Sequence, residues 1–251
     1  MTFRRRPVGR GPKSRAKDLV NIAGNAEQPK AKLIIDVWAD ALCPWCYIGE
    51  HRLESAVRQF AHAHQVELRM HTFLLDPSLS DETKPTAEYL AEKYNVPVEQ
   101  ARAMDARAAE QAALDGLPYT TDRPVRSTWD MLRLVHLGNA YGYSVGWRYM
   151  RAMQQELFGG NPDAFAHDTL VRLGEELGIP GQEIRAVLAS DRFADAVQQD
   201  HNIAVQMGAR GVPFTVLARR FAIPGATSTE QYAQVLEHVW EQIQGGGETN
   251  G

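Results

Sequence analysis

The chain has 251 residues, of which 44% are hydrophobic and 23% are charged, and its formal net charge is −4. These proportions are typical of a globular protein, and the negative charge excludes a body built to bind nucleic acid or another polyanion. No apolar run reaches the roughly 18 residues that a membrane-spanning helix needs. We therefore expect a globular protein that binds neither nucleic acid nor membranes.

The first 17 residues contain many Lys and Arg side chains and no acidic one. We interpret residues 1–31 as a disordered basic leader; a nucleic-acid-binding or targeting arm is the alternative. Because no apolar signal-peptide core follows the basic residues, we expect a cytoplasmic protein. In that compartment a cysteine pair is more often catalytic or metal-binding than structural.

The first folded segment is predicted to be a strand, a helix and a second strand. Residues 33–38 are apolar and rich in β-branched side chains, as in a buried strand. From Cys43 to Phe60 apolar side chains recur at helical spacing, and residues 66–73 alternate as a half-buried strand does. The short connection favours parallel strands joined by a right-handed crossover.

The middle of the chain, from residue 86 to residue 207, shows helical periodicity and no convincing strand. Ser127 and Asp130 predict a capping box, with Ser127 as the cap of one helix and Asp130 returning the hydrogen bond. Further helices are expected at residues 89–94, 97–114, 147–158, 167–177, 182–188 and 191–207.

Strand character returns at residues 213–217, and residues 219–223 are the expected hairpin partner, followed by a turn at Pro224 and Gly225. A last helix carries an apolar stripe from Tyr232 to Ile243. The order β-α-β, helical block, α-β-β-α predicts an α/β protein without internal repeats.

The two cysteines of the chain, Cys43 and Cys46, enclose Pro44 and Trp45 at the expected start of a helix. Unpaired N–H groups and the helix dipole stabilise a thiolate at that position, and the thiolate is the nucleophile. Cys46 lies one turn further and is placed to resolve a mixed disulfide. We interpret Cys43 as the nucleophile, with Trp45 covering the pair.

Metal binding is the main alternative for this pair. Structural zinc sites use four protein ligands, commonly two cysteine pairs or a cysteine pair with a histidine pair. No second cysteine pair exists, and His62 and His64, two positions apart on a helix, cannot face one metal. We therefore predict no metal.

The string DVWADALCPWCYIG at residues 36–49 resembles the active-site segment of the FrnE-like branch of the DsbA family. The resemblance continues at residues 71–77, 89–94 and 211–214, and it covers residues 33–243. It implies a thioredoxin fold interrupted by a large all-helical insertion. The expected parts are a leader at 1–31, thioredoxin-fold parts at 32–80 and 191–244, the insertion at 81–190 and a disordered tail at 245–251.

The resemblance also implies a cis bond between Val212 and Pro213, whose backbone would lie beside the cysteines and pair with an extended substrate. Relatives place an acid under the active site, so Asp36 is the candidate acceptor of the proton of Cys46. The alternative for Asp36 is an acid at a strand edge that faces water. His71 is expected to point outward from its strand, or to contact substrate.

These residues predict a thiol–disulfide oxidoreductase acting on protein or small-molecule disulfides as a monomer or homodimer. No cofactor is expected, and glutathione is left open as a co-substrate. One alternative is a glutathione-dependent isomerase or transferase of the kappa-like group, whose members usually carry Ser where Cys43 stands. The other is a non-enzymatic chaperone or binding protein that uses the same groove.

Overall fold

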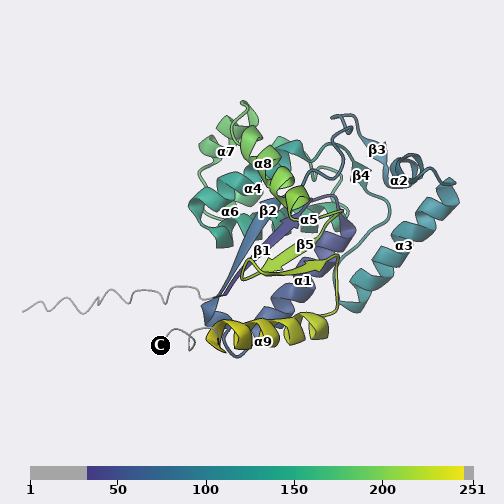
Figure 1. Ribbon diagram of the computed structural model, residues 1–251. Coiled ribbons are helices and arrows are strands. Elements are labelled where there is room, and N and C mark those ends of the chain that lie inside the picture. The colour runs from purple at the N-terminus through teal and green to yellow at the C-terminus, as the bar shows by residue number, and fades with distance from the viewer. Residues whose placement is uncertain (1–32, 246–251) are drawn as a thin grey trace, which may run out of the picture. The chain divides into compact units, whose positions relative to one another are not determined.

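The computed structural model describes residues 33–245, whose elements Figure 1 shows. The expected leader at residues 1–31 and most of the expected tail, residues 246–251, lie outside the described residues. The strands are β1 (Leu33–Ala39), β2 (Val66–Thr72), β3 (Lys84–Pro85), β4 (Pro124–Val125), β5 (Phe214–Leu217) and β6 (Phe221–Pro224). The helices are α1 (Pro44–Gln59), the 3-10 turn η1 (Ala63–Gln65), α2 (Thr86–Tyr94), α3 (Val98–Leu114), α4 (Trp129–Tyr141), α5 (Tyr143–Phe158), α6 (His167–Glu176), α7 (Gly181–Leu188), α8 (Ala194–Gln206) and α9 (Thr229–Gly245).

Four of the strands form one mixed sheet in the order β2-β1-β5-β6. Strand β1 runs parallel to β2, with Leu33 opposite Val66, and antiparallel to β5, with Ile35 opposite Leu217. The hairpin β5–β6 completes the sheet. A parallel β-α-β unit followed by an antiparallel β-β-α unit is the thioredoxin fold, and the predicted fold class is confirmed.

The two faces of β1 carry different parts of the core, because successive side chains of a strand point to opposite faces. Leu33, Ile35 and Val37 belong to the main core with residues of α1 and α9. Trp38 belongs to a second cluster with Ala204 of α8. Accordingly α1 and α9 cover one face of the sheet, while α8 lies on the other (Figure 1). This separation decides which side chains can reach the cysteines.

Helices α2–α7 lie between β2 and α8, where the insertion is expected; its boundaries at residues 81 and 190 stay a prediction. One correction concerns strands, because β3 and β4 pair antiparallel within this region, with Lys84 opposite Val125. Strands of two residues are too short to show any periodicity in sequence. Further along the chain, the hairpin partner β6 begins at Phe221 and not at residue 219, because the left-handed residues Ala218 and Arg219 turn the hairpin. Pro224 ends β6, and the chain bends at Gly225, whose φ is 77°.

The predicted capping box at α4 is wrong. Thr128 is the N-cap and makes no side-chain cap hydrogen bond, and Ser127 Oγ accepts the N–H of Trp129 at 3.3 Å. The carboxylate of Asp130 turns instead to Arg133 Nη2, 2.6 Å away. Because the side chain of Arg133 is only 4% exposed, its guanidinium needs a nearby counter-ion.

Helix α2 starts at Thr86, three residues before the expected residue 89, and two other helices also begin elsewhere than predicted. Helix α5 starts at Tyr143, four residues before the expected residue 147, directly after Gly142. Helix α8 starts at Ala194 and not at residue 191, because Phe193 adopts a left-handed conformation with φ of 68°. Neither start carries a side-chain cap that the sequence would reveal.

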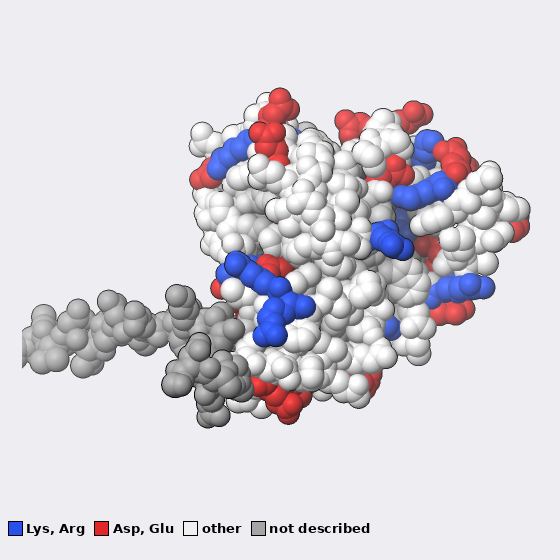
Figure 2. Space-filling model, in the orientation of Figure 1, with Lys and Arg blue, Asp and Glu red and all other residues white. Residues whose placement is uncertain are grey.

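The charged surface agrees with the low net charge. On the face that Figure 2 shows, basic and acidic side chains form small separate groups around a broad uncharged area, and neither sign forms a continuous field. Among residues 33–245 no helix is long and apolar enough to cross a membrane.

Helices α4 and α5 meet closely at two glycines. A Cβ atom added to Gly138 would lie 2.8 Å from the Cα atom of Gly146. We predict that Gly138→Ala lowers the free energy of unfolding by about 1–3 kcal/mol, because backbone cannot move aside as a flexible side chain does. At Gly211 an added Cβ meets nothing within 4 Å, so Gly211→Ala serves as the control. Urea unfolding measures both variants, and equal stabilities would contradict the close contact.

Candidate active site

Cys43 is the N-cap residue of α1, in extended conformation with φ of −81° and ψ of 115°. Its carbonyl oxygen accepts the N–H groups of Cys46 at 3.1 Å and Tyr47 at 3.2 Å. Pro44 occupies the first turn, where a missing N–H costs nothing. The structure thus places Cys43 at the N-terminus of a helix, as the sequence predicts.

The two cysteines are reduced thiols in different surroundings. Cys43 is 5% exposed and Cys46 is fully buried. Burial, followed by the hydrogen bond with Cys43 and nearby negative charge, raises the pKa of Cys46 well above its ordinary value. Cys46 therefore holds its proton unless a neighbouring group removes it.

The Val212–Pro213 peptide bond is cis, as the resemblance implies. The thiol of Cys43 donates a long hydrogen bond of 3.6 Å to the carbonyl oxygen of Val212. Gly49 lets this loop approach α1, since a Cβ there would lie 3.2 Å from both Pro213 Cγ and Ala226 Cβ. The loop and the helix therefore present the sulfur and a stretch of backbone together.

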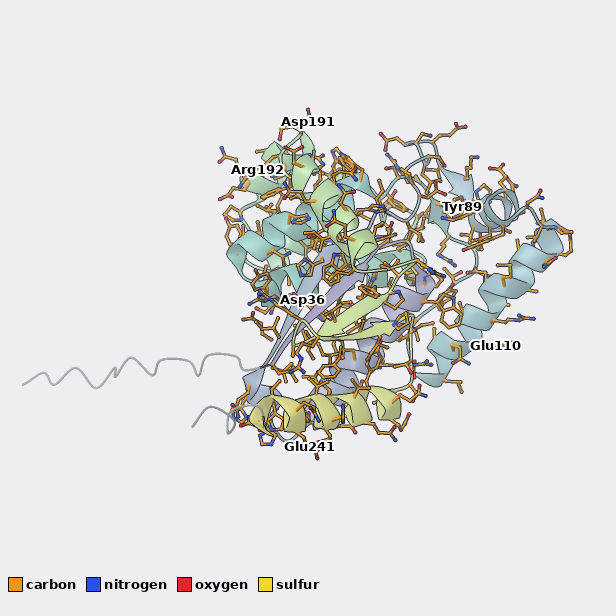
Figure 3. The ribbon with its side chains drawn as sticks, viewed as in Figure 1. Asp36, Tyr89, Glu110, Asp191, Arg192 and Glu241 are labelled. Carbon is orange, nitrogen blue, oxygen red and sulfur yellow. The ribbon has the colours of Figure 1, made fainter. Side chains whose placement is uncertain are left out.

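The structure corrects the expectation for Asp36. This residue alternates with Ile35 and Val37 and so faces α8, away from the face that holds α1 (Figure 3). It is 8% exposed, not open to water, and its Oδ1 lies 2.9 Å from Nε2 of His71. Neither the role under the cysteines nor the water-facing alternative fits this position.

His71 lies in a partly buried row of polar side chains. Its Nδ1 lies 3.1 Å from Oδ1 of Asp200 on α8, and its ring stacks on Trp38 at 4.4 Å. Asp200 also lies 3.3 Å from His136 of α4. His71 is therefore not an outward-pointing strand residue, because its ring lies between Asp36 and Asp200 and fastens α8 to the sheet.

Glu50 is the residue that sequence reasoning missed. It follows Cys46 by one turn of α1, and its side chain is fully buried. Gln154 of α5 donates to its Oε1 at 3.1 Å, and Arg151 Nη1 lies 3.5 Å from its Oε2. Burial, only partly offset by Arg151, raises the pKa of Glu50 to about 7. The signal was available, because an acid stands in the apolar stripe that contains Cys46 and Leu53.

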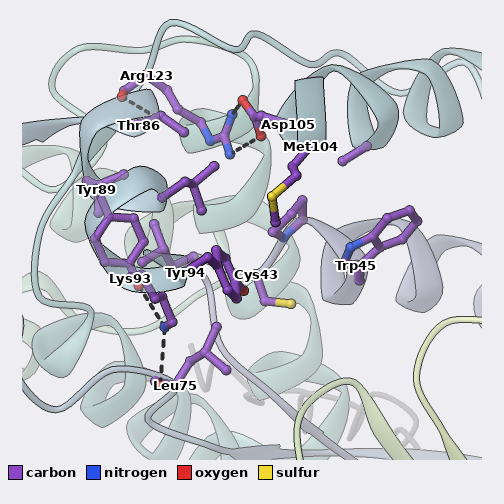
Figure 4. Close-up of a pocket in the computed structure, with 15 residues that line it drawn as sticks. Cys43, Trp45, Leu75, Thr86, Tyr89, Lys93, Tyr94, Met104, Asp105 and Arg123 are labelled. Atoms are coloured by element: carbon purple, nitrogen blue, oxygen red, sulfur yellow. Dashed lines mark hydrogen bonds and ion pairs between the residues drawn. The ribbon is translucent and has the colours of Figure 1, made fainter. Parts of the chain in front are cut away.

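A pocket adjoins Cys43 on the side of α2 and α3 (Figure 4). Pro44 and Trp45 also line it, and Trp45 is 41% exposed at its edge. Within the described part of the chain, no group of three His, Cys, Asp or Glu side chains is arranged to hold a metal ion.

Comparisons with known proteins agree with this geometry. Residues 34–237 match the family model described as a DSBA-like thioredoxin domain. The crystal structure of a probable DsbA oxidoreductase from Streptomyces coelicolor is 36% identical and covers 83% of this chain and 90% of its own, with a TM-score of 0.77. The cytosolic disulfide reductase DsbM from Pseudomonas aeruginosa, solved with GSH, is 20% identical over 83% of this chain and 99% of its own, with a TM-score of 0.55. YwbO of Bacillus subtilis, an uncharacterized protein, is 22% identical over 80% of this chain and 94% of its own.

The fold, the cysteine pair at a helix N-terminus and the cis-proline loop define a thiol oxidoreductase of the thioredoxin class. The chain belongs to the family of DsbA-like thioredoxin domains. Its place in the FrnE-like branch stays a prediction.

The row around His71 generates a prediction about pH. Burial opposes protonation of His71, but hydrogen bonds and charge from Asp200 and Asp36 outweigh it and raise the pKa of His71 to about 9. A raised folded-state pKa contributes stability that is fully present below the unfolded value of about 6.5 and is lost as pH rises through 9. We expect a loss on the order of 2–3 kcal/mol between pH 6.5 and 9.5.

Urea unfolding against pH measures this loss, in a background where both cysteines are Ser so that thiols do not titrate. The loss should disappear in His71→Gln and persist in the control His64→Gln, because His64 is exposed. A pH dependence that is the same in both variants would refute the assignment.

Proposed function

We propose that the protein is a thiol–disulfide oxidoreductase in which Cys43 is the nucleophile and Cys46 the resolving thiol, acting on protein or small-molecule disulfides. The observation that carries the proposal is the position of Cys43, at the N-terminus of α1 and 3.6 Å from the cis-proline loop. The first turn of α1 leaves N–H groups without helical partners beside this residue.

Two exchanges make up the reaction. The Cys43 thiolate attacks one sulfur of the substrate disulfide; a bond forms to Sγ of Cys43, and the other substrate sulfur leaves with the electron pair and takes a proton. Cys46, once deprotonated, attacks Sγ of Cys43 and expels the second substrate sulfur. The dithiol has then given two electrons to the substrate, and the reverse sequence oxidises a substrate dithiol with the same atoms.

We propose Glu50, in place of Asp36, as the group that accepts the proton of Cys46. Cys46 is buried with a raised pKa, so its attack needs a base close by. Glu50 lies one turn away in the same buried stripe, and its pKa of about 7 suits a base that works near neutral pH.

The backbone of Val212 is the proposed binding strip for substrate. An extended segment can pair with the N–H and C=O groups of a neighbouring chain, as in strand addition. A substrate cysteine held in this way would lie against Sγ of Cys43, because that atom already contacts the Val212 carbonyl.

We also propose that the protein acts in the cytoplasm without a cofactor, as a monomer or homodimer. Glutathione is proposed as a possible co-substrate. The DsbM structure solved with GSH favours testing glutathione first. Retention of Cys46 supports disulfide exchange over the kappa-like isomerase, which needs no resolving thiol. A chaperone role would show as protection of unfolded clients that survives loss of both sulfurs.

We predict that Cys43→Ser lowers the rate of insulin reduction by dithiothreitol at least about a hundredfold, because the attacking sulfur is gone. Cys46→Ser, reduced and then mixed with insulin in the absence of dithiothreitol, should instead accumulate a mixed disulfide between Cys43 and insulin, visible by mass spectrometry, because no resolving thiol is present. Full activity in Cys43→Ser, or no adduct in Cys46→Ser, would refute the assigned roles.

We predict that Glu50→Gln slows the attack of Cys46 on a preformed Cys43 mixed disulfide at least about tenfold at pH 8. The wild-type rate should rise through pH 7 as Glu50 ionises, and this inflection should vanish in Glu50→Gln. Glu54→Gln is the matched control, since Glu54 lies 3.7 Å from the same Arg151 but one turn further from the cysteines. Stopped-flow release of the leaving thiol measures the rate, and an unchanged pH profile in Glu50→Gln would exclude this base.

A further inference from the structure

The pocket beside Cys43 has a volume of about 100 Å³. It lies between the start of α1 and the two helices α2 and α3, and Figure 4 shows Cys43 at its edge. Its aliphatic walls come from five separate parts of the chain: Leu42, Leu75, Leu90, Met104, Ala108 and Val125. The pocket is therefore built by the inserted helices against the active-site helix.

The charged groups of this pocket are already paired. Asp105 and Arg123, with side chains 3% and 2% exposed, share two hydrogen bonds of 2.8 and 2.9 Å. Lys93 donates to Tyr89 at 2.8 Å and lies 3.3 Å from a carboxylate oxygen of Asp76. A charged occupant would therefore displace an existing partner or lose its hydration without compensation. The pocket is matched to a neutral, apolar group.

Two exposed aromatic side chains stand at the same place. Tyr94 is 51% exposed and Trp45 is 41% exposed, and both line the pocket. Large apolar side chains gathered at the surface mark sites where partners bind. Because Cys43 lines the pocket and also contacts Val212, the pocket continues the proposed backbone strip across the reactive sulfur.

We propose that this pocket takes an aliphatic side chain next to the reacting cysteine of a polypeptide substrate. The inference rests on the proposed function and deepens it, because it names the substrate class as peptides with an apolar residue beside cysteine. Since an apolar cavity of about 150 Å³ holds a benzene ring, this smaller pocket suits a branched side chain such as leucine. Glutathione, with two carboxylates and an ammonium group, would compete for Arg123 and Lys93, the cationic lining residues, which already contact Asp105 and Asp76.

The test uses the full chain with Cys43 and Cys46 joined as a disulfide, in single turnover with reduced peptides. The peptide thiolate bonds to Sγ of Cys43, the Cys43–Cys46 bond breaks, and Cys46 takes the electron pair and a proton. Three peptides differ only beside their single cysteine, with leucine before it, leucine after it, or serine on both sides. Acid quenching and mass spectrometry give the rates.

We expect at least one leucine peptide to react about tenfold faster than the serine peptide, because burial of an apolar side chain contributes at least that factor. Met104→Phe should reduce the ratio below about threefold by filling the pocket, and Leu90→Phe should act likewise. The matched control is Met207→Phe, since Met207 is 44% exposed and lies outside the pocket. Thermal unfolding of each variant identifies any loss of folding.

Three outcomes separate the inference from the proposed function. Normal exchange with dithiothreitol but equal rates for all three peptides would overturn the pocket assignment alone. Faster exchange with glutathione than with the leucine peptides, slowed by Met104→Phe, would also overturn it in favour of a glutathione site. Absence of exchange with dithiothreitol would refute the proposed function, and the inference with it.

Discussion

The buried guanidinium of Arg151 joins the helical region to the helix that carries the cysteines. From α5 it donates to the carbonyl oxygen of Tyr47 at 2.7 Å and to Gln154 at 2.9 Å, while approaching Glu50. A buried cation that loses such partners costs several kcal/mol. The thioredoxin part and the inserted helices are therefore one energetic unit, and the position of α1 depends on both.

This arrangement also fixes the proton chemistry. Cys46 and Glu50 share one buried stripe of α1, and burial disfavours the charged form of each. Both groups are negative when ionised, so ionisation of one raises the pKa of the other. The favoured state has one proton between the two groups. Arg151 stabilises the carboxylate form of Glu50. In the proposed reaction Cys46 therefore keeps its proton at first and becomes a thiolate only after Cys43 has reacted.

The sequence predicted the features that depend on neighbouring residues, but not those that depend on contacts between distant parts of the chain. Periodicity and the helix-terminus argument gave the β-α-β unit and the place of Cys43, and the cis-proline came only from the family resemblance. The sequence could not predict the environment of Asp36, because β1 is buried on both faces. The alternation of its side chains therefore could not show which face holds α1. Its partner row ends at Asp200, far along the chain, and no spacing rule connects them. Glu50, by contrast, could have been identified from the sequence, because it is an acid within an apolar stripe.

The site divides its tasks between two parts of the chain. The sulfur chemistry depends on α1 and the cis-proline loop, which belong to the thioredoxin core, whereas the pocket walls beside Cys43 come mainly from α2 and α3. Substitutions at Leu90 or Met104 change the space open to a substrate without touching the first turn of α1 or the cis-proline loop. Selection of the substrate can thus vary while the redox behaviour of the pair is kept, because the two depend on different contacts around one atom, Sγ of Cys43.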